Sequence, residues 1–274
     1  MTNILLFGCS GMLGRYVLNV LKNDYNVICI KRENYDIEKD SWIKLYSIVN
    51  EFLKENDIII NCAGIIPQKY SHENVNTYIR VNTLFPHKLY QISEKNKIKF
   101  IHITTDCVYD GTKGKYSEND IHTTKNIYGI TKSLGEPEEA TIIRTSIIGE
   151  ELTNKKSLIE WIKSNKNGEI NGYINHYWNG VTCLTLANFI KNIIDNNNFW
   201  KGVKHVFSED IVSKYDLCCY INEIYNLNID IIPTEEKYKD MTLVSDKHII
   251  LYEINDIYTQ VNEQKMYSDK FTNL

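Results

Sequence analysis

The chain has 274 residues, of which 43% are hydrophobic and 24% are charged, and its net charge is −4. This composition predicts a globular protein with a substantial core and excludes a strongly basic nucleic-acid-binding surface. No apolar run approaches the roughly 18 residues of a membrane-spanning helix, and no cationic leader precedes the first apolar run. The seven cysteines include no Cys-x-x-Cys pair, and the histidines lack metal-ligand spacing. We therefore expect a cytoplasmic protein with reduced thiols, no metal, no nucleic-acid partner and no membrane contact.

Apolar segments of strand length alternate with amphipathic segments of helix length in the first half of the chain. Strands are expected at 3–8, 26–31, 57–64, 99–106 and 140–146. Helical patterns follow at 12–23, 40–54, 74–95 and 126–136. Runs rich in Ile and Val suit strands that are covered on both faces. The alternation predicts the α/β fold of a Rossmann-type, doubly wound parallel sheet.

The pattern becomes less regular after residue 147. Helices are expected at 156–166, 183–196 and 213–224, strands at 203–207 and 229–232, and a Gly/Asn-rich loop at 165–180. This predicts two unequal parts, 1–147 and a smaller lobe at 148–274, with the 183–207 portion returning to the sheet.

Three glycines stand directly between the first expected strand and the first expected helix. Gly8, Gly11 and Gly14 give the spacing G-x-x-G-x-x-G, which differs from the usual G-x-G-x-x-G. Glycine allows a tight turn and lets backbone N–H groups approach a pyrophosphate at the helix N-terminus. Residues 1–147 are therefore expected to bind a dinucleotide, with the loop contributing Gly8, Ser10, Gly11, Met12, Leu13 and Gly14.

The end of the second strand bears on the choice of dinucleotide. An acid at this position commonly holds the ribose 2′-hydroxyl of NAD, whereas a cation can accept the 2′-phosphate of NADP. Here the strand runs into Lys31 and Arg32, and Glu33 follows. The two cations favour NADP(H), and Glu33 leaves NAD(H) open.

The segment "NIYGITKSLGE" at 126–136 places Tyr128 and Lys132 on one face of a helix, because residues four apart stack. Taken alone, the pair could be an ordinary solvated contact. The fourth strand, however, ends in Thr104, Thr105 and Asp106, and ligands of parallel sheets gather at such strand ends. A hydroxyl, a phenol and an ammonium are therefore expected to converge near the dinucleotide.

Together these motifs resemble those of the extended short-chain dehydrogenases/reductases, and they are most similar to the dTDP-4-dehydrorhamnose reductase family. The resemblance covers most of the chain and is strongest over 1–147. It is carried by the glycine loop, "NCAG" at 61–64, "TTDCVYDG" at 104–111, Tyr128-x-x-x-Lys132 and "RTS" at 144–146.

The resemblance implies a reductase of a nucleotide-linked 4-keto-6-deoxy sugar in deoxysugar and surface-glycan biosynthesis. Tyr128 would be the general acid, Lys132 would lower its pKa, and Thr105 would hydrogen-bond the reacting oxygen. Further cofactor contacts would come from Lys31, Arg32, Asp36, Ile37, Cys62, Ala63, Gly64, Thr104, Tyr128 and Lys132. The substrate would lie between the sheet edge and the smaller lobe, with its nucleotide held mostly by residues 147–182 and beyond. Substrate contacts would come from Thr105, Asp106, Cys107, Tyr128, His176 and Trp178.

Two alternatives stay open. Cys107 and His176 resemble the acid/base pair of epimerase-reductases that act on GDP- or UDP-sugars, so a combined 3,5-epimerase/4-reductase is conceivable. The chain is also similar to the β subunit of methionine adenosyltransferase, a dinucleotide-binding regulatory partner. The residues after "RTS" and the "NGVT" at 179–182 depart from the rhamnose reductase pattern, which leaves the sugar and the base undefined. A homodimer is compatible with the sequence.

Overall fold

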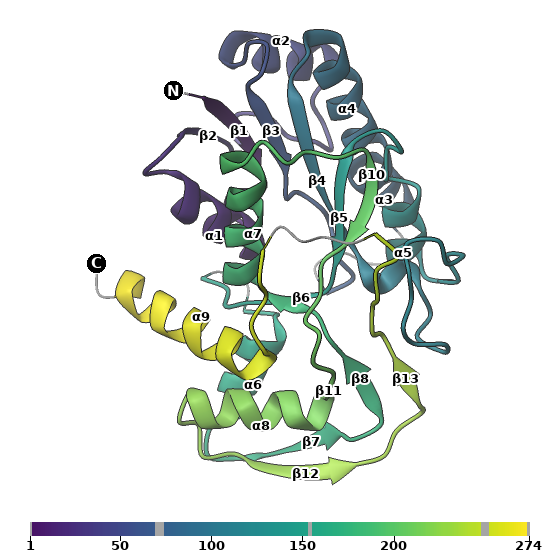
Figure 1. Cartoon of the computed structure of the whole chain (residues 1–274), viewed down its shortest axis with the longest axis vertical. Coiled ribbons are helices and arrows are strands. Elements are labelled where there is room, and N and C mark those ends of the chain that lie inside the picture. Colours follow the sequence, from purple (N-terminus) through teal and green to yellow (C-terminus); the bar gives the residue numbers. More distant parts are fainter. Residues whose placement is uncertain (1, 69–73, 153–154, 248–251, 273–274) are drawn as a thin grey trace.

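The computed structural model describes residues 2–68, 74–152, 155–247 and 252–272. Within them, six strands form one sheet in the order β10-β5-β4-β3-β1-β2 (Figure 1). They are β1 (Asn3–Phe7), β2 (Asn26–Ile30), β3 (Ile58–Asn61), β4 (Lys99–Thr105), β5 (Thr141–Thr145) and β10 (Gly202–His205). Each neighbouring pair is parallel. The predicted Rossmann-type, doubly wound sheet is confirmed.

Helices cover both faces of this sheet. One face packs on α1 (Met12–Leu21) and α7 (Cys183–Asp195), and the other packs on α2 (Trp42–Phe52) and α4 (Phe85–Asn96). Successive side chains of a strand point to opposite faces. Leu6 therefore joins the first core, whereas Leu5 and Phe7 join the second, and all three are at most 1% exposed.

The helix expected at 74–95 is interrupted. It consists of α3 (Val75–Tyr78), a π-helical turn η1 (Ile79–Leu84) and α4. Pro86 stands in the first turn of α4 and has no N–H to donate to the residue 82 carbonyl. The hydrogen-bond register changes at this point, which an apolar period alone cannot reveal.

The smaller lobe lies below the sheet in Figure 1 and combines short strands with helices. The helices are α6 (Leu158–Ser164), α8 (Lys214–Ile224) and α9 (Ile257–Thr272). The strands are β6 (Ile147–Ile148), β7 (Glu169–Tyr173), β8 (His176–Trp178), β9 (Val181–Thr182), β11 (Val212–Ser213), β12 (Asp230–Thr234) and β13 (Lys239–Asp240). β7 pairs with β12, and β8 lies between β11 and β13.

The Gly/Asn-rich loop expected at 165–180 was wrong, because β7 and β8 occupy half of it. In β7, Ile170 is buried and its neighbours Glu169 and Asn171 are exposed, so the strand has one core face despite its polar composition. After α7 the chain runs into β10, which extends the main sheet beside β5.

Two short helices complete the end of the sheet where strands β4 and β5 finish. These are the 3₁₀ helix η2 (Asp106–Val108) and α5 (Ile127–Ser133). Among the described helices, none combines the length and apolarity that a bilayer span requires.

Candidate active site

The glycine loop between β1 and α1 is packed too tightly for side chains. Gly8 has a φ of +79°, in the left-handed region that favours glycine. A Cβ atom on Gly8 would lie 2.7 Å from the Ala63 nitrogen, and one on Gly14 would lie 2.0 Å from the Gly8 carbonyl oxygen. Gly11 is the N-cap of α1, and no side chain caps that helix end. This cradle fits a pyrophosphate, which backbone N–H groups at a helix N-terminus can hold.

The cations that follow β2 are engaged with neighbouring acids. Arg32 Nη2 lies 2.6 Å from Glu38 Oε1 and Arg32 Nε lies 4.0 Å from Asp36 Oδ2. Lys31 Nζ lies 3.9 Å from Glu33 Oε1. The Arg32 and Lys31 side chains are 66% and 60% exposed. Such exposed pairs stabilise a protein by only about 0–1 kcal/mol, so a phosphate can replace the carboxylates at small cost.

Gly129 explains how Tyr128 and Lys132 come to their positions. A Cβ atom at residue 129 would lie 2.2 Å from the Cys107 carbonyl oxygen, so only glycine lets α5 rest directly on η2. Asn126 begins the helix by accepting a hydrogen bond from the Gly129 N–H (2.7 Å). The contact between these two helices therefore requires the glycine that stands between Tyr128 and Lys132.

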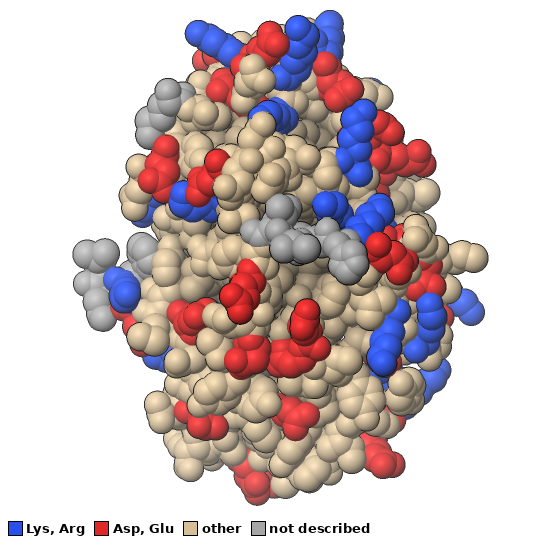
Figure 2. Space-filling model, in the orientation of Figure 1, with Lys and Arg blue, Asp and Glu red and all other residues tan. Residues whose placement is uncertain are grey.

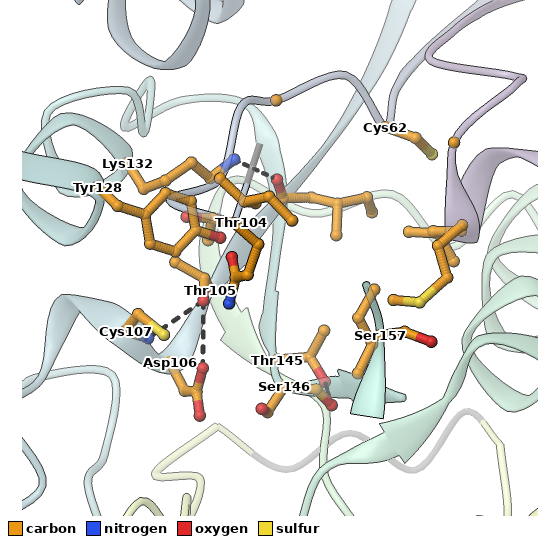
Figure 3. A pocket seen from close by; sticks show the side chains of 18 of the residues that line it. Cys62, Thr104, Thr105, Asp106, Cys107, Tyr128, Lys132, Thr145, Ser146 and Ser157 are labelled. Carbon is orange, nitrogen blue, oxygen red and sulfur yellow. Dashed lines mark hydrogen bonds between the residues drawn. The ribbon is translucent and has the colours of Figure 1, made fainter. Parts of the chain in front are cut away.

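Lys132 is buried and holds a fixed position. Its side chain donates a hydrogen bond from Nζ to the Ile103 carbonyl oxygen (2.8 Å; Figure 3), and the residue is 5% exposed. Burial lowers the pKa of Lys132 to about 8, and the negative charge of Glu136 opposes this shift. The ammonium form still predominates at neutral pH.

Burial raises the pKa of Tyr128 above its ordinary value, and the nearby Cys107 adds to the rise. A side-chain hydrogen bond from Thr105 acts in the opposite direction. The predicted lowering of the Tyr128 pKa was wrong, because desolvation of the phenol dominates. The phenol thus keeps its proton, which suits a general acid.

Thr105 is at the centre of a small hydrogen-bonded group at the end of β4. Its Oγ1 donates to Asp106 Oδ1 (3.1 Å) and accepts from the Cys107 backbone N–H (3.1 Å). Asp106 is 4% exposed, and burial raises the pKa of its carboxyl. Burial also raises the pKa of the Cys107 thiol to about 12, so this group remains protonated.

These side chains line one cavity of about 520 Å³, which we call the Tyr128 cavity (Figure 3). One wall comes from the glycine loop and the end of β3, and the other from β4, η2 and α5. Predicted site residues in the lining are Gly11, Met12, Leu13, Cys62, Ala63, Gly64, Thr104, Thr105, Asp106, Cys107, Tyr128 and Lys132. A phenolic proton, a hydroxyl and an ammonium therefore face the same space as the glycine loop.

Residues 1–242 match the family model described as the RmlD substrate binding domain. The chain belongs to this family. The resemblance inferred from the sequence motifs is confirmed by this match.

The relatives of this RmlD-family chain include reductases and a subunit of another enzyme. It is 28% identical over 151 residues to the dTDP-4-keto-6-deoxy-D-glucose reductase of Streptomyces niveus, which covers 52% of this chain and 51% of that protein. It is 23% identical over 256 residues to methionine adenosyltransferase 2 subunit beta of Danio rerio, covering 85% and 77%. Its fold is similar to that of a Bacillus anthracis dTDP-4-dehydrorhamnose reductase in complex with NADP, with a TM-score of 0.82, 18% identity and coverage of 97% and 100%. The match to the Streptomyces reductase thus spans about half of that protein.

Some predicted residues of this family member lie outside the Tyr128 cavity. Gly8, Ser10, Gly14, Lys31, Arg32, Asp36 and Ile37 surround the glycine loop and the end of β2 without lining it. The Ile37 carbonyl accepts a hydrogen bond from Arg80 Nε (2.6 Å). Trp178 is 3% exposed in the core of the smaller lobe, so its indole does not face the cavity. The alternation of β8 turns this side chain inward.

His176 lies in a second hollow of about 710 Å³, which shares Cys107 and Asn126 with the Tyr128 cavity. Three of its lining residues are Lys125, Lys237 and Lys239, and we call it the lysine groove. None of these three ammonium groups is ion-paired with a described residue. In Figure 2, Lys and Arg lie along the edge of the smaller lobe near β13, whereas Asp and Glu occupy its middle.

Several cavity residues were not expected from the sequence. They are Ile66, Pro67, Gln68, Ile103, Asn126, Thr145 and Ser146. The cavity also includes Ile147, Ile148, Glu151, Lys156, Ser157 and Leu158, which fall within the range 147–182 expected to hold the nucleotide but were not singled out. Ser146 belongs to the "RTS" motif, whose position after β5 could have indicated a cavity residue. The segment after β6 carries no comparable signal.

A buried polar network anchors the C-terminal end of α5. Arg144, 2% exposed, donates to both carboxylate oxygens of Glu136 (3.2 and 2.6 Å). It also donates to the Tyr109 hydroxyl (2.8 Å), His205 Nε2 (3.0 Å) and His122 Nε2 (2.9 Å). The network connects the helix that carries Lys132 to β5 and β10.

Proposed function

We propose that the protein is an NAD(P)H-dependent reductase of a nucleotide-linked 4-keto-6-deoxy sugar. The observation that carries this proposal is that Thr105, Tyr128 and Lys132 line one cavity with the glycine loop. A nicotinamide dinucleotide held by that loop would supply hydride to a carbonyl carbon. The protein's own groups complete the reduction at the oxygen.

Tyr128 donates its phenolic proton to the oxygen of the reacting carbonyl, and Thr105 donates a hydrogen bond to the same atom. Positioned proton donors contribute typically about 10²–10⁴-fold to such steps. The Lys132 ammonium, fixed by the Ile103 carbonyl, stabilises the phenolate that remains. Reprotonation of Tyr128 from solvent restores the site.

NADPH is the proposed preferred cofactor because Arg32 and Lys31 present two exposed cations at the end of β2. NADH has no 2′-phosphate and so could not replace the Glu38 carboxylate beside Arg32. The NADP in the Bacillus anthracis neighbour supports this choice.

The lysine groove supports a nucleotide-linked substrate. In such sugars, the anomeric carbon that bears the diphosphate lies across the ring from C4. With the C4 carbonyl of the sugar beside Tyr128, the diphosphate would point toward the lysine groove, which adjoins the Tyr128 cavity at Cys107. Lys125, Lys237 and Lys239 can neutralise them there.

Two features argue against the alternative activities. Cys107 is held as a thiol by its raised pKa. His176 lines the lysine groove and not the Tyr128 cavity, and its Nε2 donates to the Lys237 carbonyl oxygen (2.7 Å). A regulatory subunit does not require the complete Thr105, Tyr128 and Lys132 set, which here shares one cavity.

The test is to mix the purified protein with NADPH or NADH and a panel of dTDP-, UDP- and GDP-linked 4-keto-6-deoxyhexoses, following cofactor absorbance. We expect NADPH oxidation with at least one member. Tyr128→Phe should lower turnover by about a hundredfold or more, with cofactor affinity unchanged. The control variant Tyr46→Phe, on α2, should leave turnover unchanged. Absence of turnover with every member would refute the proposal.

A further inference from the structure

The Thr105 hydroxyl has a single proton and two neighbours that can receive it. One is Asp106 Oδ1, 3.1 Å away, and the other is the Tyr128 phenol, to which Thr105 is also hydrogen-bonded. The Cys107 N–H already occupies one lone pair of Oγ1. The protonation of the Asp106 carboxyl therefore decides where the Thr105 proton can point.

The two forms of the carboxyl have opposite consequences. An ionised Asp106 accepts the Thr105 proton and draws it away from the reacting oxygen. A protonated Asp106 donates to the second lone pair of Oγ1, and the Thr105 proton is then free for the phenol or the substrate. Only in the second form does the chain Asp106–Thr105 present a donor to the cavity.

The surroundings of Asp106 favour the protonated form. The residue is 4% exposed and makes no ion pair within 4.0 Å among the described residues. The groups that face its carboxyl are Thr105, Cys107, Ser146 after β5, Tyr128 of α5 and Lys214 at the start of α8. Hydrogen bonds from Ser146, Thr105 and Cys107 and the nearby Lys214, whose own pKa is lowered by burial, favour the ionised carboxyl. Burial of Asp106 outweighs them and raises the pKa of its carboxyl.

We propose that Asp106 is a positioning residue that, when protonated, turns the Thr105 hydroxyl toward the reacting oxygen. This role rests on the proposed reductase function. It gives Asp106, which lines the Tyr128 cavity, an action on the reacting oxygen through its neighbour Thr105. The donor it directs is of the oxyanion-stabilising kind, whose complete removal costs about 10²–10³-fold in turnover.

The experiment measures the pH profile of kcat for wild type, Asp106→Asn and Asp106→Ala with NADPH and the best keto sugar. We expect wild-type kcat to fall about tenfold as Asp106 ionises. The Asn amide, a permanent donor, should keep kcat level over the same pH interval. Asp106→Ala should remain, at every pH, about tenfold below the low-pH kcat of the wild type, because the Thr105 donor is only partly directed toward the reacting oxygen.

A double-mutant cycle separates positioning from general damage. If Asp106 acts through Thr105, Asp106→Ala should cost less than about twofold in a Thr105→Ala background. A tenfold cost in that background would overturn the proposal. In ¹³C-labelled protein, the Asp106 carboxyl resonance is identified as the one that is missing from Asp106→Asn. Its titration should give a pKa above the ordinary value of about 3.9. A pKa at or below that value would also overturn the proposal. An inactive wild type refutes the reductase function and this role together, whereas an active wild type with the same pH profile as Asp106→Asn refutes this role alone.

Discussion

Replacing Glu136 by Gln is the most direct test of what holds the Tyr128 helix in place. Glu136 is the one acid that neutralises Arg144 among the described residues, and both side chains are almost fully buried, at 7% and 2% exposed. Gln preserves the size of the side chain and removes its charge. The Arg144 guanidinium would then remain buried without a carboxylate partner, beside two histidines that accept hydrogen bonds from it.

The expected loss can be estimated from this geometry. Removing one partner of a buried ion pair costs about 3–5 kcal/mol, because the other charge is left uncompensated. The remaining amide oxygen still accepts one hydrogen bond, so we expect about 3 kcal/mol. For a protein of this size, that corresponds to a fall in melting temperature of roughly 6–12 °C.

The assay is urea and thermal unfolding of the variant beside a matched control. Lys201 and Glu139 form a pair at 2.7 Å, but their side chains are 77% and 59% exposed. Glu139→Gln should therefore cost no more than about 1 kcal/mol. Equal destabilisation by Glu136→Gln and Glu139→Gln would refute the claim that burial makes the first pair important.

The same variant should change the chemistry of the site. The charge of Glu136 raises the pKa of Lys132 against the effect of burial, so its removal should bring that pKa below about 8. The ammonium would then be lost at lower pH. The high-pH decline of kcat should move toward neutrality in Glu136→Gln and remain unchanged in Glu139→Gln.

Three further results are expected. Gly14→Ala should lower the melting temperature by about 5 °C or more, because its Cβ would lie 2.0 Å from a carbonyl oxygen, whereas Gly11→Ala meets the same atom at 3.2 Å and should lower it by less than half as much. His205, whose pKa burial and the adjacent arginine lower to about 4, binds protons less readily in the folded chain than in the unfolded one. Unfolding free energy should therefore decline as pH falls from about 6.5 to about 4, and urea titrations should show a shallower decline in His205→Asn. Glu38→Gln removes the carboxylate 2.6 Å from Arg32 and should lower the KM for NADPH about threefold, leaving the KM for NADH unchanged; equal changes for both cofactors would contradict a 2′-phosphate contact.

The main sheet was predictable because its signal is local. The strands are continuous apolar runs such as "IIIN" in β3, which a doubly covered sheet requires. The position of Tyr128 and Lys132 over the end of β4 followed from the general rule that ligands of parallel sheets gather at the carboxyl ends of strands.

The smaller lobe was less predictable because its strands are short and polar. In "HYW" the inward side chain is Trp178, which had been expected among the substrate contacts. The direction of the Tyr128 pKa was also missed, since spacing shows that a lysine is near but not how strongly both groups are desolvated. Lys237 and Lys239 reach the site only because β13 pairs with β8. The boundary at 147, a homodimer and a cytoplasmic location stay predictions.

The late return of the chain to the main sheet makes the first part of the protein depend on the second. α7 and β10 come after half of the elements of the smaller lobe in the chain, yet α7 covers one face of the main sheet together with α1. A polypeptide ending at residue 147 would expose part of that face to solvent and would leave β5 without β10 beside it. The two parts are therefore interdependent, because the core and the sheet of residues 1–147 are completed by α7 and β10 from the second part.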